Sequence, residues 1–213
     1  MSEQTDWISR HAQKSLERLL PGVRAAIGAD DKKQDILWKE FEERTRLHWE
    51  RLFRLLLQLY GWQYDFFYHL EQILVTAARS WARRPEYLKE LDARREADPQ
   101  WFQSQEMVGG VLYVDLFSHN LAGLHDHIAY FKKLGLTYLH IMPLFAAPHG
   151  NSDGGYAVSD YRAINPDIGT MQELSYLAGT LHKEGISLVL DLVMNHTSDD
   201  HVWARSAKSG DPD

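Results

Sequence analysis

The run of apolar residues from Ile186 to Met194 constrains the fold of this chain more than any other segment. Its residues are nearly all apolar, which is typical of a strand in a parallel sheet that is covered on both faces. The same reasoning predicts strands over residues 111–117, 137–142 and 187–194, with helices over residues 121–134 and 171–183 between them. This alternation of strand and helix predicts an α/β fold with a parallel sheet.

The ends of the two predicted helices carry signals of their own. Gly135 and Gly185 follow the helices, at the position where a residue in the left-handed conformation commonly ends a helix. Thr170 and Glu173 have the spacing of a capping box at the start of the second helix. The helix boundaries are therefore predicted independently of the apolar pattern.

A long connection follows the second predicted strand. It covers residues 143–169, about 27 residues, whereas loops between a strand and a helix usually have ~2–6. Enzymes built on parallel sheets place substrate-binding residues at the carboxyl ends of the strands. Two polar clusters, residues 149–156 and 191–196, lie at such ends. We therefore expect a functional site at this rim of the sheet.

Composition changes near residue 106. Residues 1–106 hold 3 of the 14 glycines and 6 of the 7 tryptophans, so we predict an all-helical domain over residues 1–106 and a second domain over residues 107–213. One buried helix face is predicted from the i, i+3, i+4, i+7 spacing of Leu52, Leu55, Leu56 and Leu59. The aromatic residues of segment 62–68 are also predicted to be core.

Charge and composition exclude several classes of protein. The chain is 44% apolar and 25% charged, as in soluble globular proteins. Its net charge of −7 has the wrong sign for binding nucleic acid. No segment approaches the ~20 apolar residues of a membrane span, and the first residues lack the order of a signal peptide. We expect a cytoplasmic protein with neither nucleic acid nor membrane as partner. The absence of cysteine excludes disulfides and thiolate metal sites.

The first polar cluster contains candidate ligand-binding residues. Gly154 and Gly155 permit a backbone excursion that lets Asp153 and Tyr156 face inward. A tyrosine offers an apolar ring face and a hydroxyl, which suits contact with a sugar. An ordinary glycine-rich turn is the alternative interpretation.

Asp191 is the candidate of the second cluster. It lies within the apolar third strand, where a buried carboxylate is costly unless it is paired or hydrogen-bonded. It either braces neighbouring loop backbone or belongs to a set of acidic residues around a substrate. The residues alone leave both interpretations open.

Three strings together resemble the α-amylase family of glycoside hydrolases, glycoside hydrolase family 13. They are Asp153-Gly-Gly-Tyr156, Asn165-Pro-Asp-Ile-Gly169-Thr170 and Asp191-Leu-Val-Met-Asn195-His196. The last is similar to the family's first conserved region, at the end of the third strand of its catalytic barrel. The resemblance implies the first three strands of a (β/α)₈ TIM barrel. Because such a barrel takes roughly 250 residues, we expect the barrel to be incomplete in this chain.

Within the family, the likeness is greatest to the amylosucrase group. It rests on the helical domain that precedes the sheet and on residues 109–117, 138–145 and 152–159. The resemblance implies transfer of the glucosyl unit of sucrose to an α-1,4-glucan acceptor with release of fructose. It implies no cofactor and no metal. A sucrose hydrolase, a sucrose isomerase or an α-glucosidase would share these residues.

The resemblance also implies roles for single residues. Tyr156 would stack on the glucosyl ring, His196 would hydrogen-bond one of its hydroxyls, and Asp153 would close the pocket. Asp191 and Asn195 would be structural residues at the rim of the site. The nucleophile and the acid/base carboxylate are expected beyond residue 213, so this chain alone is expected to be inactive.

Two other functions compete with this interpretation. A metal-dependent hydrolase would use pairs such as His125 and His127, but on a helix these side chains point in different directions. We expect both to be surface histidines. The second alternative is a non-catalytic remnant that acts as an interaction module through the helical domain.

Overall fold

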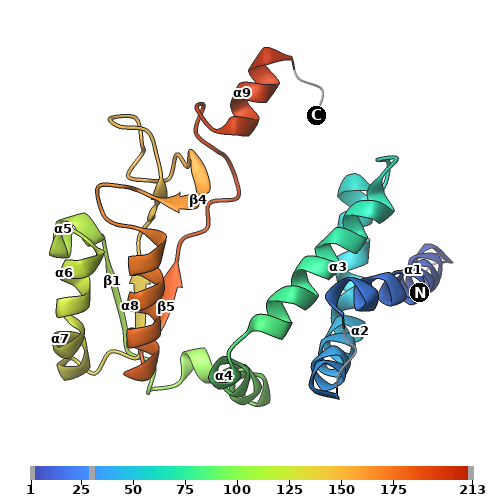
Figure 1. The fold of residues 1–213 in the computed structure, drawn as a ribbon, viewed down its shortest axis with the longest axis horizontal. Coiled ribbons are helices and arrows are strands. Elements are labelled where there is room, and N and C mark those ends of the chain that lie inside the picture. The colour runs from blue at the N-terminus through green and yellow to red at the C-terminus, as the bar shows by residue number, and fades with distance from the viewer. Residues whose placement is uncertain (1–2, 29–31, 211–213) are drawn as a thin grey trace. The chain divides into compact units, whose positions relative to one another are not determined.

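The computed structural model describes residues 3–28 and 32–210. The chain forms two compact units, residues 1–97 and residues 98–213 (Figure 1). The division lies nearer the N-terminus than the predicted boundary after Glu106. Each unit has its own hydrophobic core.

The first unit is helical. It consists of α1 (Glu3–Ile27), α2 (Lys32–Tyr60), α3 (Phe66–Arg83) and α4 (Glu86–Ala97). Its core joins side chains of α1, α2 and α3, among them Leu16, Phe53 and Leu70. The indole Nε1 of the buried Trp49 donates a hydrogen bond of 2.7 Å to the carbonyl of Ala12. This bond fixes α2 against α1 inside the core.

The buried face of α2 differs from the predicted one. Leu55 is 49% exposed and Leu59 is 61% exposed, whereas Trp49 and Phe53 are 3% and 1% exposed. The prediction is therefore wrong for the leucine face, on which only Leu56 packs against the core. The helix carries two apolar stripes, and the aromatic one, which has more area to bury, faces α1 and α3.

The aromatic segment 62–68 is core at one position. Phe66 is 5% exposed, but Trp62 is 78% and Tyr64 is 98% exposed. The physical reason is the turn at residues 61–65, because α2 ends at Tyr60 and Phe66 opens α3. The prediction of a core segment is wrong for the residues in this turn, and also for Phe67 and Tyr68 in the first turn of α3, which are 56% and 60% exposed.

The second unit contains a parallel sheet. Its strands are β1 (Gly109–Leu112), β2 (Tyr138–Ile141) and β5 (Ser187–Leu190), in the order β1-β2-β5. Four helices, α5 (Val114–Ser118), α6 (Leu121–Asp126), α7 (Ile128–Lys133) and α8 (Met171–Lys183), share its apolar core. Figure 1 shows α6, α7 and α8 alongside the strands. The predicted fold class is confirmed: these are the first three strands of a TIM-barrel fold, and the barrel is not closed.

Several predicted boundaries are corrected. The first strand ends at Leu112, because the following residues turn into α5. The predicted helix 121–134 divides at His127 into α6 and α7. The third strand ends at Leu190, so Asp191 lies just beyond it.

Besides α5, further elements of the described chain were not predicted. The long connection contains an antiparallel pair, β3 (Phe145–Ala146) and β4 (Asp160–Ile164), and α9 (Val202–Ser209) lies near the C-terminus.

The predicted helix signals are confirmed. Gly135 and Gly185 have φ angles of 75° and 77°, in the left-handed region that favours glycine. The amide of Glu173 donates to the Thr170 hydroxyl at 3.2 Å, and the Thr170 amide donates to the Glu173 carboxylate at 2.8 Å. The capping box of α8 is therefore complete.

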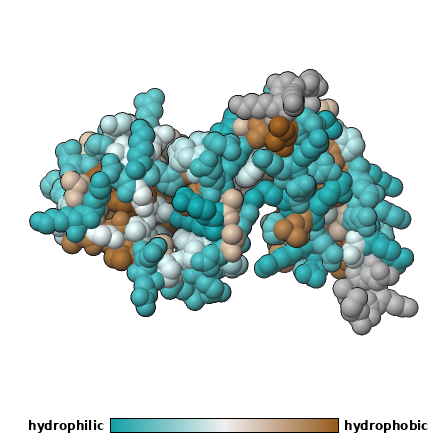
Figure 2. All heavy atoms as spheres, turned by 90° about the horizontal axis from the view of Figure 1, so that it is seen from below, coloured by the Kyte–Doolittle hydropathy of each residue, from teal (hydrophilic) through white to brown (hydrophobic). Residues whose placement is uncertain are grey.

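Apolar side chains reach the surface among hydrophilic ones (Figure 2). Trp62 in the first unit, and Leu116 and Met194 in the second, are each more than three-quarters exposed. None of the helices in the described residues is long and apolar enough to cross a membrane.

The buried face of α2 can be tested with a pair of alanine substitutions. We expect Phe53→Ala to lower the free energy of unfolding by about 3–5 kcal/mol, because it leaves a cavity in the core. Leu59→Ala on the exposed stripe should change it by no more than about 0.5 kcal/mol. Urea unfolding followed by tryptophan fluorescence measures both. Equal losses in the two variants would contradict this assignment of the buried face.

Candidate functional site

The two faces of the parallel sheet have different surroundings. Leu139 and Ile141 of β2 are fully buried in the core that the helices share. Side chains alternate along a strand, so His140 lies on the opposite face. In the register of the sheet it is paired with Val111 of β1 and Val189 of β5, and Val111 is 65% exposed. The face that carries His140 is the one that points inward in a closed barrel.

Asp191 connects two distant segments at the carboxyl rim of this sheet. Its Oδ1 lies 2.9 Å from Nε2 of His140, and its Oδ2 accepts a 3.0 Å hydrogen bond from the hydroxyl of Tyr156. About a quarter of each of the Asp191 and His140 side chains is exposed. Both carboxylate oxygens therefore have a side-chain partner, as a half-buried carboxylate requires.

A turn with two glycines brings Tyr156 to Asp191. Gly154 and Gly155 have φ angles of 66° and 91°, which side chains other than glycine rarely adopt. A Cβ on Gly155 would lie 3.1 Å from the Cβ of Pro143. The Gly155 amide donates a 3.0 Å hydrogen bond to the carbonyl of Ser152. The two glycines thus allow the close approach of the turn to the end of β2.

The surroundings of Tyr156 favour its protonated form. Desolvation is the largest cause that raises its pKa, followed by the hydrogen bond to Asp191 and by the charge of that carboxylate. Tyr113 and Asp153 raise the pKa further. Tyr156 therefore remains a hydrogen-bond donor to Asp191 at neutral pH.

Asp153 lies in the same turn, with a positive φ of 50°. Its side chain is exposed, and within the described part of the chain the structure records no hydrogen bond to its carboxylate. Asp153 and Tyr156 thus differ, because one side chain is free and the other is anchored.

His196 and Asn195 lie on the loop that follows β5. Both are exposed, and the Asn195 amide nitrogen lies 3.3 Å from Nδ1 of His196. Tyr161 supports this loop through its hydroxyl, which donates to the carbonyl of Val193 and lies 3.2 Å from that of His196. A hollow of about 490 Å³ borders the loop and is lined by Tyr161, Leu192, Val193, Met194, Asn195, His196, Thr197 and Trp203. The structure therefore joins Tyr156 to Asp191, leaves the Asp153 side chain exposed in the same turn, and places His196 beside a neighbouring hollow.

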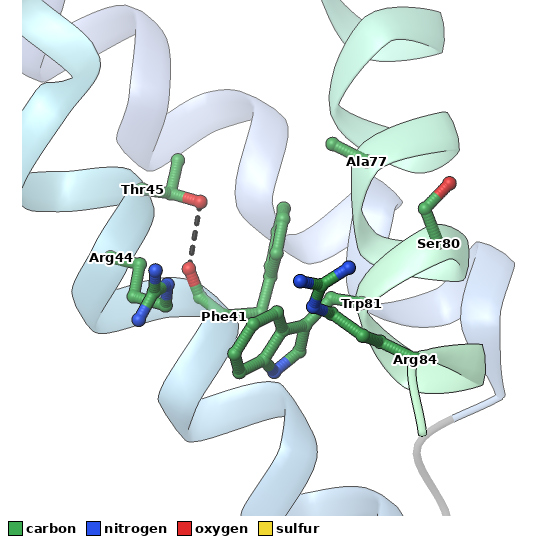
Figure 3. A pocket seen from close by; sticks show the side chains of 7 residues that line it. All are labelled: Phe41, Arg44, Thr45, Ala77, Ser80, Trp81 and Arg84. Carbon is green, nitrogen blue, oxygen red and sulfur yellow. Dashed lines mark hydrogen bonds between the residues drawn. The ribbon is translucent and has the colours of Figure 1, made fainter. Parts of the chain in front are cut away.

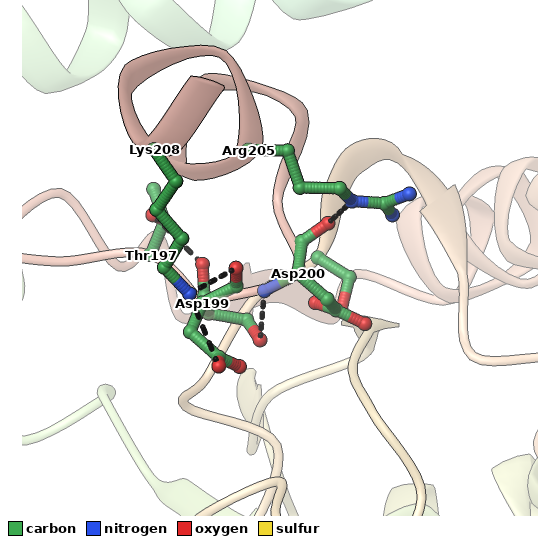
Figure 4. Close-up of polar contacts among 7 residues, drawn as sticks. Thr197, Asp199, Asp200, Arg205 and Lys208 are labelled. Carbon is green, nitrogen blue, oxygen red and sulfur yellow. Dashed lines mark hydrogen bonds and ion pairs between the residues drawn. The ribbon is translucent and has the colours of Figure 1, made fainter. Parts of the chain in front are cut away.

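Polar contacts hold the far end of this loop (Figure 4). The Ser159 hydroxyl donates a 2.6 Å hydrogen bond to Asp200, and the hydroxyls of Ser159 and Ser198 lower the pKa of Asp200. Arg205 donates to the Asp200 carbonyl, and Lys208 pairs with Asp199 at 3.4 Å. These contacts tie the loop to β4 and to α9.

A further hollow lies in the helical unit, between α2 and α3 (Figure 3). The guanidinium of Arg44 lies 4.7 Å from the ring centre of Trp81 and is bonded to Glu96. Arg84 binds Asp92 through two hydrogen bonds of 2.7 and 2.8 Å. Because its arginines already have carboxylate partners, we interpret this hollow as part of the packing between the helices.

His140 is the site residue that sequence reasoning did not identify. The available signal was a lone polar side chain between Leu139 and Ile141 in an apolar strand. Its partner lies 51 residues away, which the sequence pattern does not reveal. Among the described residues, no group of three or more histidine or acidic side chains is placed to hold a metal ion.

Comparisons with known proteins point to one family. Residues 96–213 match the family model described as alpha amylase, catalytic domain. The chain is similar to an oligo-1,6-glucosidase of Parageobacillus thermoglucosidasius, with 42% identity over 93 residues, which are 43% of this chain and 16% of that protein. It is also similar to a trehalose synthase of Pimelobacter sp. (strain R48), with 35% identity over 126 residues, 54% of this chain and 21% of that protein.

A solved structure shows a similar partial match. A mutant of isomaltulose synthase from Erwinia rhapontici NX5, in complex with D-glucose, is 32% identical with a TM-score of 0.45. The match covers 49% of this chain and 20% of that one. The chain thus spans about a fifth or less of the length of the proteins that it matches.

The close approach at Gly155 can be tested against a matched glycine. Gly150 has a φ of 75° but no atom within 4 Å of its Cβ position. Alanine at either position should cost about 1–2 kcal/mol for the left-handed backbone, and Gly155→Ala should cost more because it meets Pro143. Amide hydrogen exchange of residues 150–158 measures the effect. Equal exchange rates in the two variants would show that the contact with Pro143 does not matter.

Proposed function

Because this chain belongs to the α-amylase family, we propose that its second unit forms part of the α-glucoside-binding site of a glycosidase or transglycosylase. The observation that carries the proposal is the anchoring of Tyr156 by Asp191 at the carboxyl rim of three parallel strands, with the tyrosine hydroxyl 3.0 Å from the carboxylate. An anchored aromatic ring can stack on the apolar face of a sugar without first being ordered by it.

The other residues of the rim supply hydrogen bonds in this proposal. Asp153 has an exposed carboxylate that can accept from a sugar hydroxyl, and His196 has an exposed imidazole. Both carboxylate oxygens of Asp191 already have partners, His140 and Tyr156, so Asp191 acts on a sugar only through Tyr156. Asn195 braces the ring of His196.

We further propose sucrose as the glucosyl donor and an α-1,4-glucan as acceptor, with fructose released, as in amylosucrases. The support is the resemblance of residues 109–117, 138–145 and 152–159 to that group and the helical unit that precedes the sheet. No cofactor enters this reaction.

The bond-breaking step requires groups other than those described. Retaining enzymes of this kind use a nucleophilic carboxylate and an acid/base carboxylate that lie ~5–5.5 Å apart. By family resemblance, both come from strands beyond the three of this sheet. We therefore expect residues 1–213 to bind sugar without cleaving its glycosidic bond.

The second candidate is an enzyme that acts on other α-glucosides. The identity of 42% to an oligo-1,6-glucosidase and of 35% to a trehalose synthase favours this alternative. The donor sugar separates the two candidates.

Sugar binding to the 213-residue chain tests the proposal. We expect sucrose to shift the backbone amide resonances of residues 152–158 and 191–197 in NMR titrations. Isomaltose and trehalose should bind more weakly. Tyr156→Ala should lower the affinity for sucrose by about tenfold or more, because the stacking face is lost. Tyr176→Ala, an exposed tyrosine on α8, is the control and should leave the affinity unchanged.

The outcomes separate the proposals. If isomaltose or trehalose binds more tightly than sucrose, the sucrose assignment is wrong but the α-glucoside site stands. If no α-glucoside perturbs these resonances, the site proposal is wrong. Release of fructose from sucrose by the purified chain would contradict the expectation that the reacting carboxylates lie elsewhere.

A further inference from the structure

We propose that His140 is a positioning residue of this site: through Asp191 it fixes the Tyr156 hydroxyl, and thereby the angle at which the tyrosine ring meets a sugar. Only the last part of this inference, the contact between the tyrosine ring and a sugar, rests on the proposed function. The chain of contacts from β2 to the turn is independent of any ligand.

The register of the sheet explains how His140 reaches Asp191. His140 is paired with Val189 of β5, and Asp191 follows two residues later on the same face, because side chains alternate. The Asp191 side chain can therefore lean back over the central strand, where its Oδ1 meets Nε2 of His140 at 2.9 Å. The neighbouring positions on this face, Val111 and Val189, are apolar. An apolar side chain would pack between them equally well, so packing alone does not explain a histidine at position 140.

Asp191 needs both partners to hold one orientation. With Tyr156 alone, the carboxylate could rotate and exchange this hydrogen bond for water, because the side chain is 24% exposed. The bond from His140 occupies the other oxygen and fixes the plane of the carboxylate. The central strand thereby determines where Oδ2 lies.

The turn cannot fix the tyrosine ring without this anchor. Tyr156 follows Gly154 and Gly155 in a partly exposed segment, and its backbone N–H donates a hydrogen bond of 3.2 Å to the Asp153 carbonyl. The backbone therefore places Tyr156 near the rim, but its hydroxyl contact determines the direction of the ring. Tyr113 and Asp153 also lie close enough to affect Tyr156 electrostatically.

Glutamine and asparagine at position 140 provide a matched pair of variants. The amide of His140→Gln can reach Asp191, whereas the shorter side chain of His140→Asn cannot. Both variants are polar and of similar size, so a difference between them reports the hydrogen bond. His149→Ala is the control, because His149 is an 86% exposed histidine of the same long connection that lies near Asp167.

The first measurement needs no ligand. The pKa of Tyr156, followed by NMR of ¹³Cζ-labelled tyrosine and assigned with Tyr156→Phe, is raised in the wild type partly by Asp191. We expect it to fall toward the ordinary tyrosine value of about 10 in His140→Asn, and to stay raised in His140→Gln and His149→Ala. An unchanged or higher pKa in His140→Asn would overturn the proposal.

The second measurement is the affinity for sucrose. His140→Asn should bind about tenfold more weakly, because the ring must be ordered on binding, and His140→Gln should recover the affinity to within about threefold. Equal affinities in the two variants would overturn the positioning role. If the wild type binds no sugar, the proposed function fails, and the pKa of Tyr156 still decides whether His140 fixes Asp191.

Discussion

The parallel register of β2 between β1 and β5 is the constraint on which the second unit depends. It places Leu139 and Ile141 in the core beneath the helices and His140 on the other face. A slip of one residue would exchange the two faces, burying the histidine and exposing the core. The hydrophobic core and the candidate site therefore select the same register. The same alignment brings the ends of the strands to one rim, where Asp191 meets the turn that contains Tyr156.

The contribution of Asp191 is geometric more than energetic. A partly exposed contact between two polar side chains contributes ~1 kcal/mol to stability, and the Asp191 and His140 side chains are 24% and 28% exposed. The carboxylate nevertheless joins segments that lie 35 and 51 residues away in sequence. It thus orders a turn whose own backbone is held in the left-handed conformation at Gly154 and Gly155.

The features that the sequence predicts correctly are those that depend on residues close together in the chain. The glycine ends of two helices and the capping box at Thr170 depend on neighbouring residues, and all three predictions are confirmed. The prediction of a buried leucine face on α2 was wrong because burial of this helix depends on α1, where the Ala12 carbonyl accepts a hydrogen bond from Trp49. The sequence suggested that Asp153, Tyr156 and Asp191 share one rim; the structure joins Tyr156 to Asp191 and leaves the Asp153 side chain exposed in the same turn. His140 was not identified because a lone polar residue between Leu139 and Ile141 does not show which residue it contacts, and its role depends on Asp191, 51 residues away in the sequence.

Under the proposed function, the anchoring of Tyr156 means that different residues supply the apolar contact and the hydrogen bonds to a sugar. Its hydroxyl hydrogen is already donated to Asp191, so a sugar meets only the apolar ring of this residue. Hydrogen bonds must then come from side chains such as Asp153 and His196, which are exposed. A sugar ring has an apolar face and a polar edge, which matches one anchored aromatic surface and several exposed polar groups. The ring common to all α-glucosides would be recognised by the anchored tyrosine, and the choice among donors would depend on the exposed polar groups around it.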